Sequence, residues 1–119
     1  MLPYKRSQRV GDLLREEIAD IIMHKLKDPR IGFITVTGVD LTDDLKIATV
    51  YISVLKEEEK TTTLEILNAA KSFIRSELSK RVRLRYIPSI DFKNDASIEY
   101  GSKIEKLLDD IRRKSEGSS

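Results

Sequence analysis

The sequence has no cysteine and no tryptophan, and His24 is the single histidine among its 119 residues. The lack of cysteine excludes disulfides, zinc fingers, iron–sulfur clusters and thiol nucleophiles, and one histidine excludes metal sites built from several imidazoles. No apolar run approaches the roughly 20 residues of a membrane-spanning helix, and residues 1–10 lack the apolar core of a signal peptide. We therefore expect a cytosolic protein without metal, cofactor, membrane contact or small-molecule substrate.

Positive charge is concentrated in one segment of the chain. The formal net charge is only +2, yet residues 71–93 hold seven basic and two acidic side chains. A solvated helix face is the alternative, but the arginine content favours a phosphate-binding patch, because a guanidinium group can hold a phosphate in bidentate fashion. The predicted RNA contacts in this segment are Lys71, Arg75, Lys80, Arg81, Arg83 and Arg85. A second, weaker basic cluster consists of Lys5, Arg6 and Arg9, for which a solvated tail is an equal alternative.

The first half of the chain predicts a helix followed by a β-hairpin. Apolar residues recur at helical spacing over 7–27, with Ser7 as N-cap, and Pro29 is expected to end this helix. The β-branched residues of 33–39 and the apolar run 46–55 predict two strands. The turn between them is short, so the strands are expected to pair antiparallel.

The second half predicts a long helical segment, a third strand and a last helix. Thr62 and Glu65 match a capping box, so the helical segment is expected over 62–84, with a possible bend at the small residues 69–72. A strand follows at 89–93 and a helix runs to about 113. The crossover connection should place the third strand parallel to one hairpin strand. The sequence thus predicts one α+β domain over 1–113 with a three-stranded mixed sheet and a disordered polar tail at 114–119.

Several short motifs resemble those of the bacterial ribosome-binding factor A family. They extend over about residues 5–112 in the family's order and spacing. The matching pieces are 28–30 (DPR), 35–37 (TVT), 44–48 (DLKIA), 73–78 (FIRSEL), 84–88 (LRYIP), Phe92 and 95–97 (DAS).

The resemblance implies a KH-like fold of the second type, with the element order α-β-β-α-α-β-α. It also implies a non-enzymatic factor that binds the small ribosomal subunit and contacts 16S rRNA. Such a factor assists late maturation of the subunit, including rRNA 5′-end processing and growth in the cold. We expect a monomer, because the sequence shows no clear surplus apolar face.

One motif departs from ordinary KH domains, which clamp nucleic-acid backbone with a GXXG loop between two helices. No two glycines in this chain are three residues apart. The family replaces the loop with a kinked Ala-X-Gly, and this chain has Ala70, Lys71 and Ser72 at those positions. Because serine reaches left-handed φ less easily than glycine, the kink is expected to be shallower. A helix N-cap or a small packing residue without RNA contact is an equal alternative.

Two other functions are alternatives to RNA binding. Asp40, Asp43 and Asp44, or Asp91 with Asp95, could hold Mg²⁺ in a small RNA nuclease, but aspartates are also ordinary turn and cap residues. His24, at the edge of the apolar helix stripe, has no visible catalytic partner and is expected at the edge of the core. No catalytic residue is therefore predicted.

The second alternative is a protein-only adaptor that docks a ribosomal protein through Glu57, Glu58 and Glu59, although a solvated loop fits this run better. Base-specific reading is not expected, because the chain has few aromatic residues. Tyr51 could face solvent, whereas the predicted core positions include Phe33, Phe73, Phe92 and Tyr100.

Overall fold

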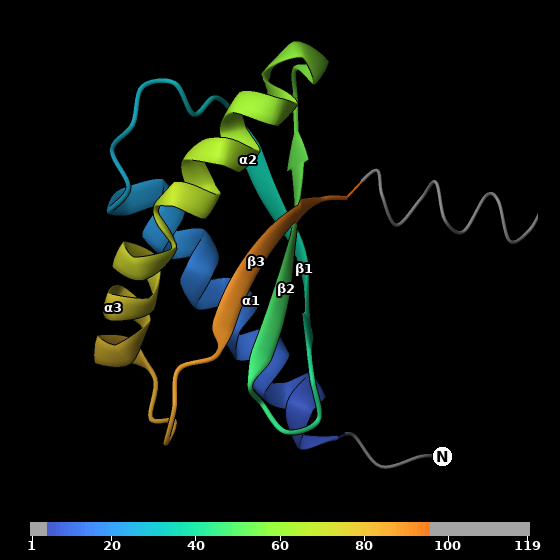
Figure 1. The fold of residues 1–119 in the computed structure, drawn as a ribbon, viewed down its shortest axis with the longest axis vertical. Coiled ribbons are helices and arrows are strands. Elements are labelled where there is room, and N and C mark those ends of the chain that lie inside the picture. Colours follow the sequence, from blue (N-terminus) through green and yellow to red (C-terminus); the bar gives the residue numbers. More distant parts are fainter. Residues whose placement is uncertain (1–4, 96–119) are drawn as a thin grey trace, which may run out of the picture.

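The computed structural model describes residues 5–95 (Figure 1). Four helical segments and three strands follow one another along this part of the chain. They are α1 (Arg6–His24), β1 (Ile34–Leu41), β2 (Ile47–Val54), the 3₁₀ helix η1 (Glu57–Glu59), α2 (Lys60–Ala69), α3 (Lys71–Arg81) and β3 (Ser89–Asn94). The predicted helix to residue 113 and the tail at 114–119 lie outside the described residues.

The sheet has the order β1-β2-β3, with β2 in the centre. Strand β1 pairs antiparallel with β2, from Ile34 opposite Val54 to Leu41 opposite Ala48, with a bulge between Val36 and Gly38. Strand β3 pairs parallel with β2, because the helical crossover returns the chain in the direction of β2. The predicted hairpin and the mixed three-stranded sheet are confirmed.

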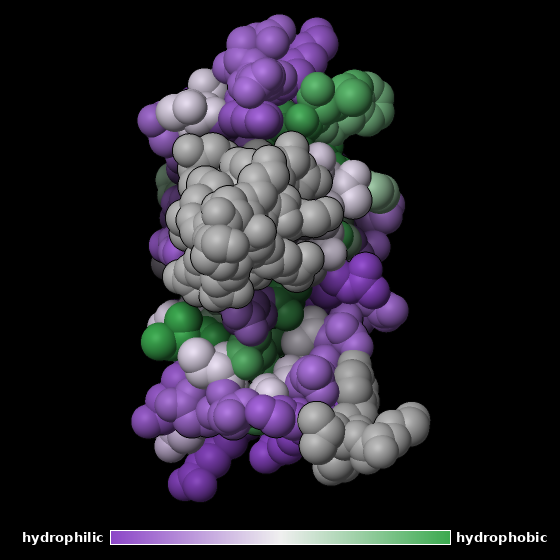
Figure 2. All heavy atoms as spheres, turned by 90° about the vertical axis from the view of Figure 1, so that its right-hand side faces the viewer, coloured by the Kyte–Doolittle hydropathy of each residue, from purple (hydrophilic) through white to green (hydrophobic). Residues whose placement is uncertain are grey.

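Within residues 5–95, the helices cover one face of the sheet (Figure 1). Alternation in β2 fixes this face, since Ala48, Val50, Ile52 and Val54 are buried and the residues between them are not. The core lies between these side chains and the apolar stripes of α1 and α3. On the opposite face, shown in Figure 2, the coloured surface is largely hydrophilic with separate apolar patches, and both ends along the long axis carry hydrophilic residues.

Helix α1 differs from the prediction at both of its ends. Its N-cap is Lys5, and Ser7 is a buried residue of the first turn whose hydroxyl donates to Asp43 over 3.2 Å. The helix ends at His24, before the Asp28-Pro29 pair. The Asp28 carboxylate accepts the Arg30 backbone N–H at 2.9 Å, and such local bonds favour a turn over further helix.

The predicted helix over 62–84 is two helices that meet at Ala70. The predicted capping box is wrong, because α2 continues from η1 and already includes Thr62. At Ala70 the backbone has φ −93° and ψ 9°, and its N–H is shared between the carbonyls of Ile66 and Leu67. Alanine reaches this bridge conformation without left-handed strain, so the break needs no glycine, and Ser72 lies inside α3.

Strand β3 forms one edge of the sheet, and a side chain of α2 covers part of that edge. The Asn68 amide donates to the Phe92 carbonyl (3.4 Å) and accepts the Phe92 backbone N–H (3.1 Å). One side chain thus satisfies both backbone groups that a fourth strand would otherwise pair. Asn68 thereby fixes β3 against the helical layer.

We predict that Asn68→Ala lowers the free energy of unfolding by about 1–3 kcal/mol, because the Phe92 groups lose their partners in a partly buried site. The measurement is a urea titration followed by circular dichroism. Thr61→Ala, at an exposed position of the same helix, is the matched control and should change stability by less than about 0.5 kcal/mol. Equal effects of the two variants would contradict the edge-covering role of Asn68.

Candidate nucleic-acid interface

The loop 82–88, between α3 and β3, presents arginines to solvent. Helix α3 ends at Arg81, and Val82 is already extended. Val82 and Leu84 pack toward the core, whereas the alternate residues Arg83 and Arg85 are exposed. Within residues 5–95, Arg83 makes no ion pair or hydrogen bond, and Arg85 lies over the ring of Tyr86. These two predicted contacts are thus available to a phosphate.

Two other members of the basic segment hold the fold together. The Arg75 guanidinium donates from Nε to the Pro88 carbonyl and from an Nη to the Ile87 carbonyl, both at 3.0 Å. Lys71 forms an ion pair with Asp91 of β3 at 3.4 Å. Arg75 and Lys71 therefore join α3 to β3 and to the end of the loop. Their bonds fix the end of the loop relative to α3 and β3.

Arg81 is turned toward α1 and is paired with two carboxylates. One Nη atom lies 3.2 Å from Glu17 and 2.5 Å from Asp20, and the side chain is only 21% exposed. The hydrogen bond from Arg81, supported by a second from His24, holds the pKa of Asp20 below its ordinary value. The prediction of a core-edge histidine is wrong, since the His24 side chain is 62% exposed and bonds Asp20 at 2.8 Å.

Lys80 has an intermediate position among the predicted contacts. Its ammonium forms an exposed i,i+3 pair with Glu77 at 3.3 Å. Exposed pairs of this kind contribute little and exchange readily with solvent. Lys80 can therefore turn toward a phosphate, unlike Arg81.

The N-terminal basic cluster lies at the same end of the molecule as the loop 82–88. In Figure 1 the start of α1, the turn between β1 and β2, and this loop all lie at the lower end. The Ser7 hydroxyl and the Lys5 ammonium reach Asp43 in the turn, and the Ser89 N–H donates to the Lys46 carbonyl at 2.8 Å. We call this surface the basic end. Its exposed guanidinium groups belong to Arg6, Arg9, Arg83 and Arg85.

Three of the five carboxylates considered for a nuclease have structural partners in the described chain, namely Asp43, Asp44 and Asp91. Asp44 accepts the Thr42 hydroxyl at 2.6 Å and the Lys46 backbone N–H at 3.1 Å, and these bonds lower its pKa. Asp43 accepts the Ser7 hydroxyl. In the described part of the chain, no three histidine or acidic side chains gather closely enough to hold a metal ion. The geometry of Asp43 and Asp44 is that of a capped hairpin turn.

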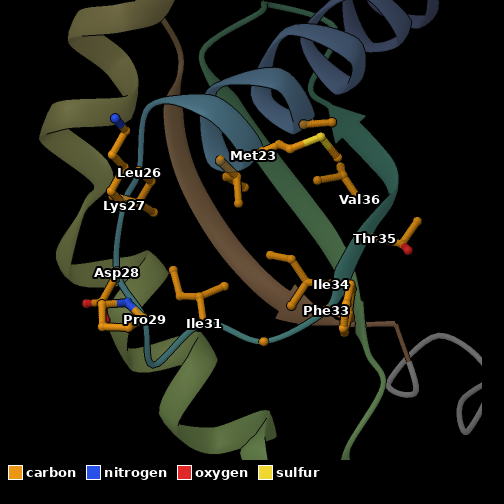
Figure 3. A pocket seen from close by; sticks show the side chains of 13 residues that line it. Met23, Leu26, Lys27, Asp28, Pro29, Ile31, Phe33, Ile34, Thr35 and Val36 are labelled. Atoms are coloured by element: carbon orange, nitrogen blue, oxygen red, sulfur yellow. The ribbon is translucent and has the colours of Figure 1, made fainter.

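An apolar pocket lies at the C-terminal end of α1, away from the basic end. Its volume is about 810 Å³, and the end of α1, the loop to β1 and the first residues of β1 line it. Met23, Ile34 and Val36 lie around it in Figure 3. Its one acidic residue, Asp28, is bound by the Arg30 guanidinium and backbone N–H, which lower the pKa of Asp28 to about 2. A carboxyl held in this way is not suited to acid–base chemistry near neutral pH.

Two phenylalanines that were predicted to lie in the core are exposed. Phe33 is 83% exposed and Phe73 is 41% exposed, so neither is a core residue as predicted, whereas Phe92 is buried. Phe33, Met23 and their neighbours form a surplus apolar face. The expectation of a monomer rested on the absence of such a face and stays a prediction. Among residues 5–95, the helices also lack the combined length and apolarity needed to cross a bilayer.

We predict that Arg81→Gln lowers the free energy of unfolding at neutral pH, and that the difference from the original chain narrows as the pH falls below about 4, the ordinary carboxyl value. Because Arg81 lowers the folded-state pKa of Asp20, the pair stabilises the protein above the unfolded carboxyl pKa and loses this effect as Asp20 gains a proton. The measurement is thermal unfolding over that pH range. Lys80→Gln, the same charge change on the neighbouring residue, is the control with little effect. A loss of stability in Arg81→Gln that does not change with pH would contradict the ion-pair role.

The chain is similar to known proteins over most of its length. The family model for ribosome-binding factor A matches residues 6–108. The ribosome-binding factor A of Thermodesulfovibrio yellowstonii is 58% identical over 116 residues, which cover 98% of each chain. The crystal structure of ribosome-binding factor A from Thermus thermophilus is similar, with a TM-score of 0.67 and 31% identity over 74% of this chain and 94% of that one.

A second Thermus thermophilus structure is a homology model of ribosome-binding factor A fitted into the cryo-EM map of a complex with the 30S subunit. It matches with a TM-score of 0.60 and 32% identity, over 70% of this chain and 88% of that one. The element order, the mixed sheet and the Ala70 break are those expected of a KH-like fold of the second type. By its fold, and by sequence identity over nearly its whole length, this chain belongs to the ribosome-binding factor A family.

Proposed function

We propose that this protein binds the small ribosomal subunit through 16S rRNA and assists its late maturation in the cytoplasm without catalysing a reaction. Membership of the family supports this proposal. The Thermus thermophilus relative supports it too, since its model was fitted into the map of a 30S complex. The proposal extends to rRNA 5′-end processing and to growth in the cold.

The single observation that carries the proposal is the basic end. Arg83 and Arg85 are exposed on the loop 82–88, and Arg6 and Arg9 are exposed at the start of α1. Guanidinium groups without a partner among residues 5–95 are available to neutralise phosphates, and contacts to the sugar–phosphate backbone position a protein without reading sequence. We therefore assign Arg6, Arg9, Lys80, Arg83 and Arg85 to phosphate contact. Lys71, Arg75 and Arg81 are assigned to positioning, and Lys5 is shared with Asp43.

A factor of this kind need only prefer one rRNA arrangement over another. Differential binding shifts the population toward the preferred conformer, by as much as the two affinities differ. Misfolded RNA persists longer in the cold, so such a factor should matter more at low temperature. The factor leaves when the mature surface no longer offers the phosphates in the required positions.

We predict that affinity for the small subunit falls steeply with salt, with a slope of log K against log salt of roughly −3 to −4 for four or five phosphate contacts. The double variant Arg83→Gln, Arg85→Gln should reduce the magnitude of this slope by about 1.5, because two phosphates lose their partners. The measurement is cosedimentation of the full chain with purified subunits over a salt series.

The matched control removes two other exposed cations. Lys25 follows α1 and Lys56 precedes η1, so both lie away from the basic end (Figure 1). The variant Lys25→Gln, Lys56→Gln has the same net charge as the arginine variant and should keep the original slope. Equal slopes for the two variants would show that net charge, and not the basic end, determines binding.

The nuclease alternative yields a separate prediction. Purified protein with Mg²⁺ should leave labelled precursor rRNA intact, because Asp43 and Asp44 serve the hairpin turn. Cleavage that disappears in Asp43→Asn or Asp44→Asn would overturn the non-enzymatic assignment. Cleavage that persists in both variants is assigned to a contaminating nuclease only if it separates from the protein on further purification. Cleavage that co-purifies with the protein would also overturn the non-enzymatic assignment.

A further inference from the structure

Tyr86 stands out on the surface of the basic end. Its side chain is 70% exposed, although the residues around it in the loop 82–88 are anchored. Val82 and Pro88 are buried, and Leu84 and Ile87 pack partly against the core. Within residues 5–95 the Tyr86 hydroxyl has no hydrogen-bond partner. Neither burial nor a polar bond therefore explains an aromatic ring at this position.

The backbone that carries Tyr86 is held from two sides. Arg75 donates to the carbonyls of Ile87 and Pro88, the two residues that follow Tyr86. The next residue, Ser89, donates its N–H to the Lys46 carbonyl in the hairpin turn. A ring presented by a fixed backbone loses little conformational freedom when a ligand binds to it.

The ring has a cation on one side and phosphate-binding groups beside it. The Arg85 guanidinium carbon lies 5.5 Å from the centre of the Tyr86 ring, a cation–π contact that orients both groups. Arg83 is exposed two residues before Arg85. A flat aromatic surface next to two guanidinium groups is the combination with which proteins hold single-stranded nucleic acid, one base on the ring and phosphates on the cations.

We infer that Tyr86 stacks on the base of an unpaired ribonucleotide while Arg83 and Arg85 hold the adjoining phosphates. Stacking on a ring does not read base identity, so the inference agrees with the absence of base-specific reading expected from the sequence. It does require the base to be free, because a base inside a duplex cannot reach the ring. The inference deepens the proposed function by naming the kind of rRNA segment that the basic end takes.

The chain has no tryptophan, so Tyr86→Trp introduces a single indole reporter that keeps an aromatic ring in place. Short single-stranded RNA should quench its fluorescence. A duplex of the same sequence and an abasic ribose–phosphate strand of the same length should leave it nearly unchanged. Phe33→Trp, at the exposed apolar pocket, is the matched control and should not respond to any of the three.

A second pair of variants measures affinity. Tyr86→Leu should weaken binding of the single strand by about 5- to 150-fold and leave the abasic strand unaffected, whereas Tyr86→Phe should bind both like the original chain. Because residue 86 is exposed, thermal unfolding should be unchanged in each variant. Unaltered affinity in Tyr86→Leu, or equal quenching by the abasic strand, would overturn the stacking role.

Failure of the stacking inference can be distinguished from failure of the proposed function. If the chain cosediments with small subunits but single-stranded RNA does not quench the Tyr86→Trp variant, the stacking inference alone is wrong. If single-stranded RNA quenches that variant and Tyr86→Leu weakens binding, yet the chain does not cosediment with subunits, the proposed function fails and the stacking site stands.

Discussion

The parallel edge strand β3 has to be attached to a helical layer that reaches it from two directions, and polar side chains make this attachment. The break at Ala70 lets α2 and α3 lie along the same strand at different angles (Figure 1). Asn68 binds the backbone of Phe92, and Arg75 binds the carbonyls that precede β3. A parallel strand needs such a crossover. Part of the basic segment, including Arg75, is therefore engaged in bonds within the fold and is not available to a ligand.

The arginines of the basic segment therefore fall into two groups, those bonded within the fold and those exposed to solvent. Coulomb attraction to a phosphate is strong only for a cation that is not already paired, and Arg81 is paired with two carboxylates of α1. Arg83 and Arg85 follow the end of the helix, where extended backbone directs alternate side chains outward. The segment 71–93, with its excess of positive charge, thus presents fewer free cations than its sequence suggests, and the start of α1 extends this surface from the other side of the hairpin turn.

The sheet was predicted correctly because strands are recognised from short runs of sequence and their pairing follows from the connections between them. The β-branched run 33–39, the apolar run 46–55, the short turn between them and the helical crossover were sufficient for the hairpin and for the parallel third strand. Helix ends were predicted less well, since Ser7 looked like a cap but bonds Asp43, 36 positions away. The partners of Arg81 are 61 and 64 positions away, and a basic run shows nothing of such pairs. Tyr86 was missed as a functional residue. Aromatic residues were assigned from their spacing in helices and strands, which indicates core positions, and a loop residue has no such spacing.

An exposed ring beside free arginines bears on how a factor could respond to maturation. Phosphates are present on immature and mature rRNA alike, so cation contacts alone distinguish the two only by their spacing. An unpaired base is different, because it is lost to the protein once it enters a helix, and the stacking contribution is then lost with it. A surface that combines Arg83 and Arg85 with Tyr86 would therefore bind an unfolded segment and release it on pairing. Pairing would supply the free energy for release, and the protein itself would need no chemical step.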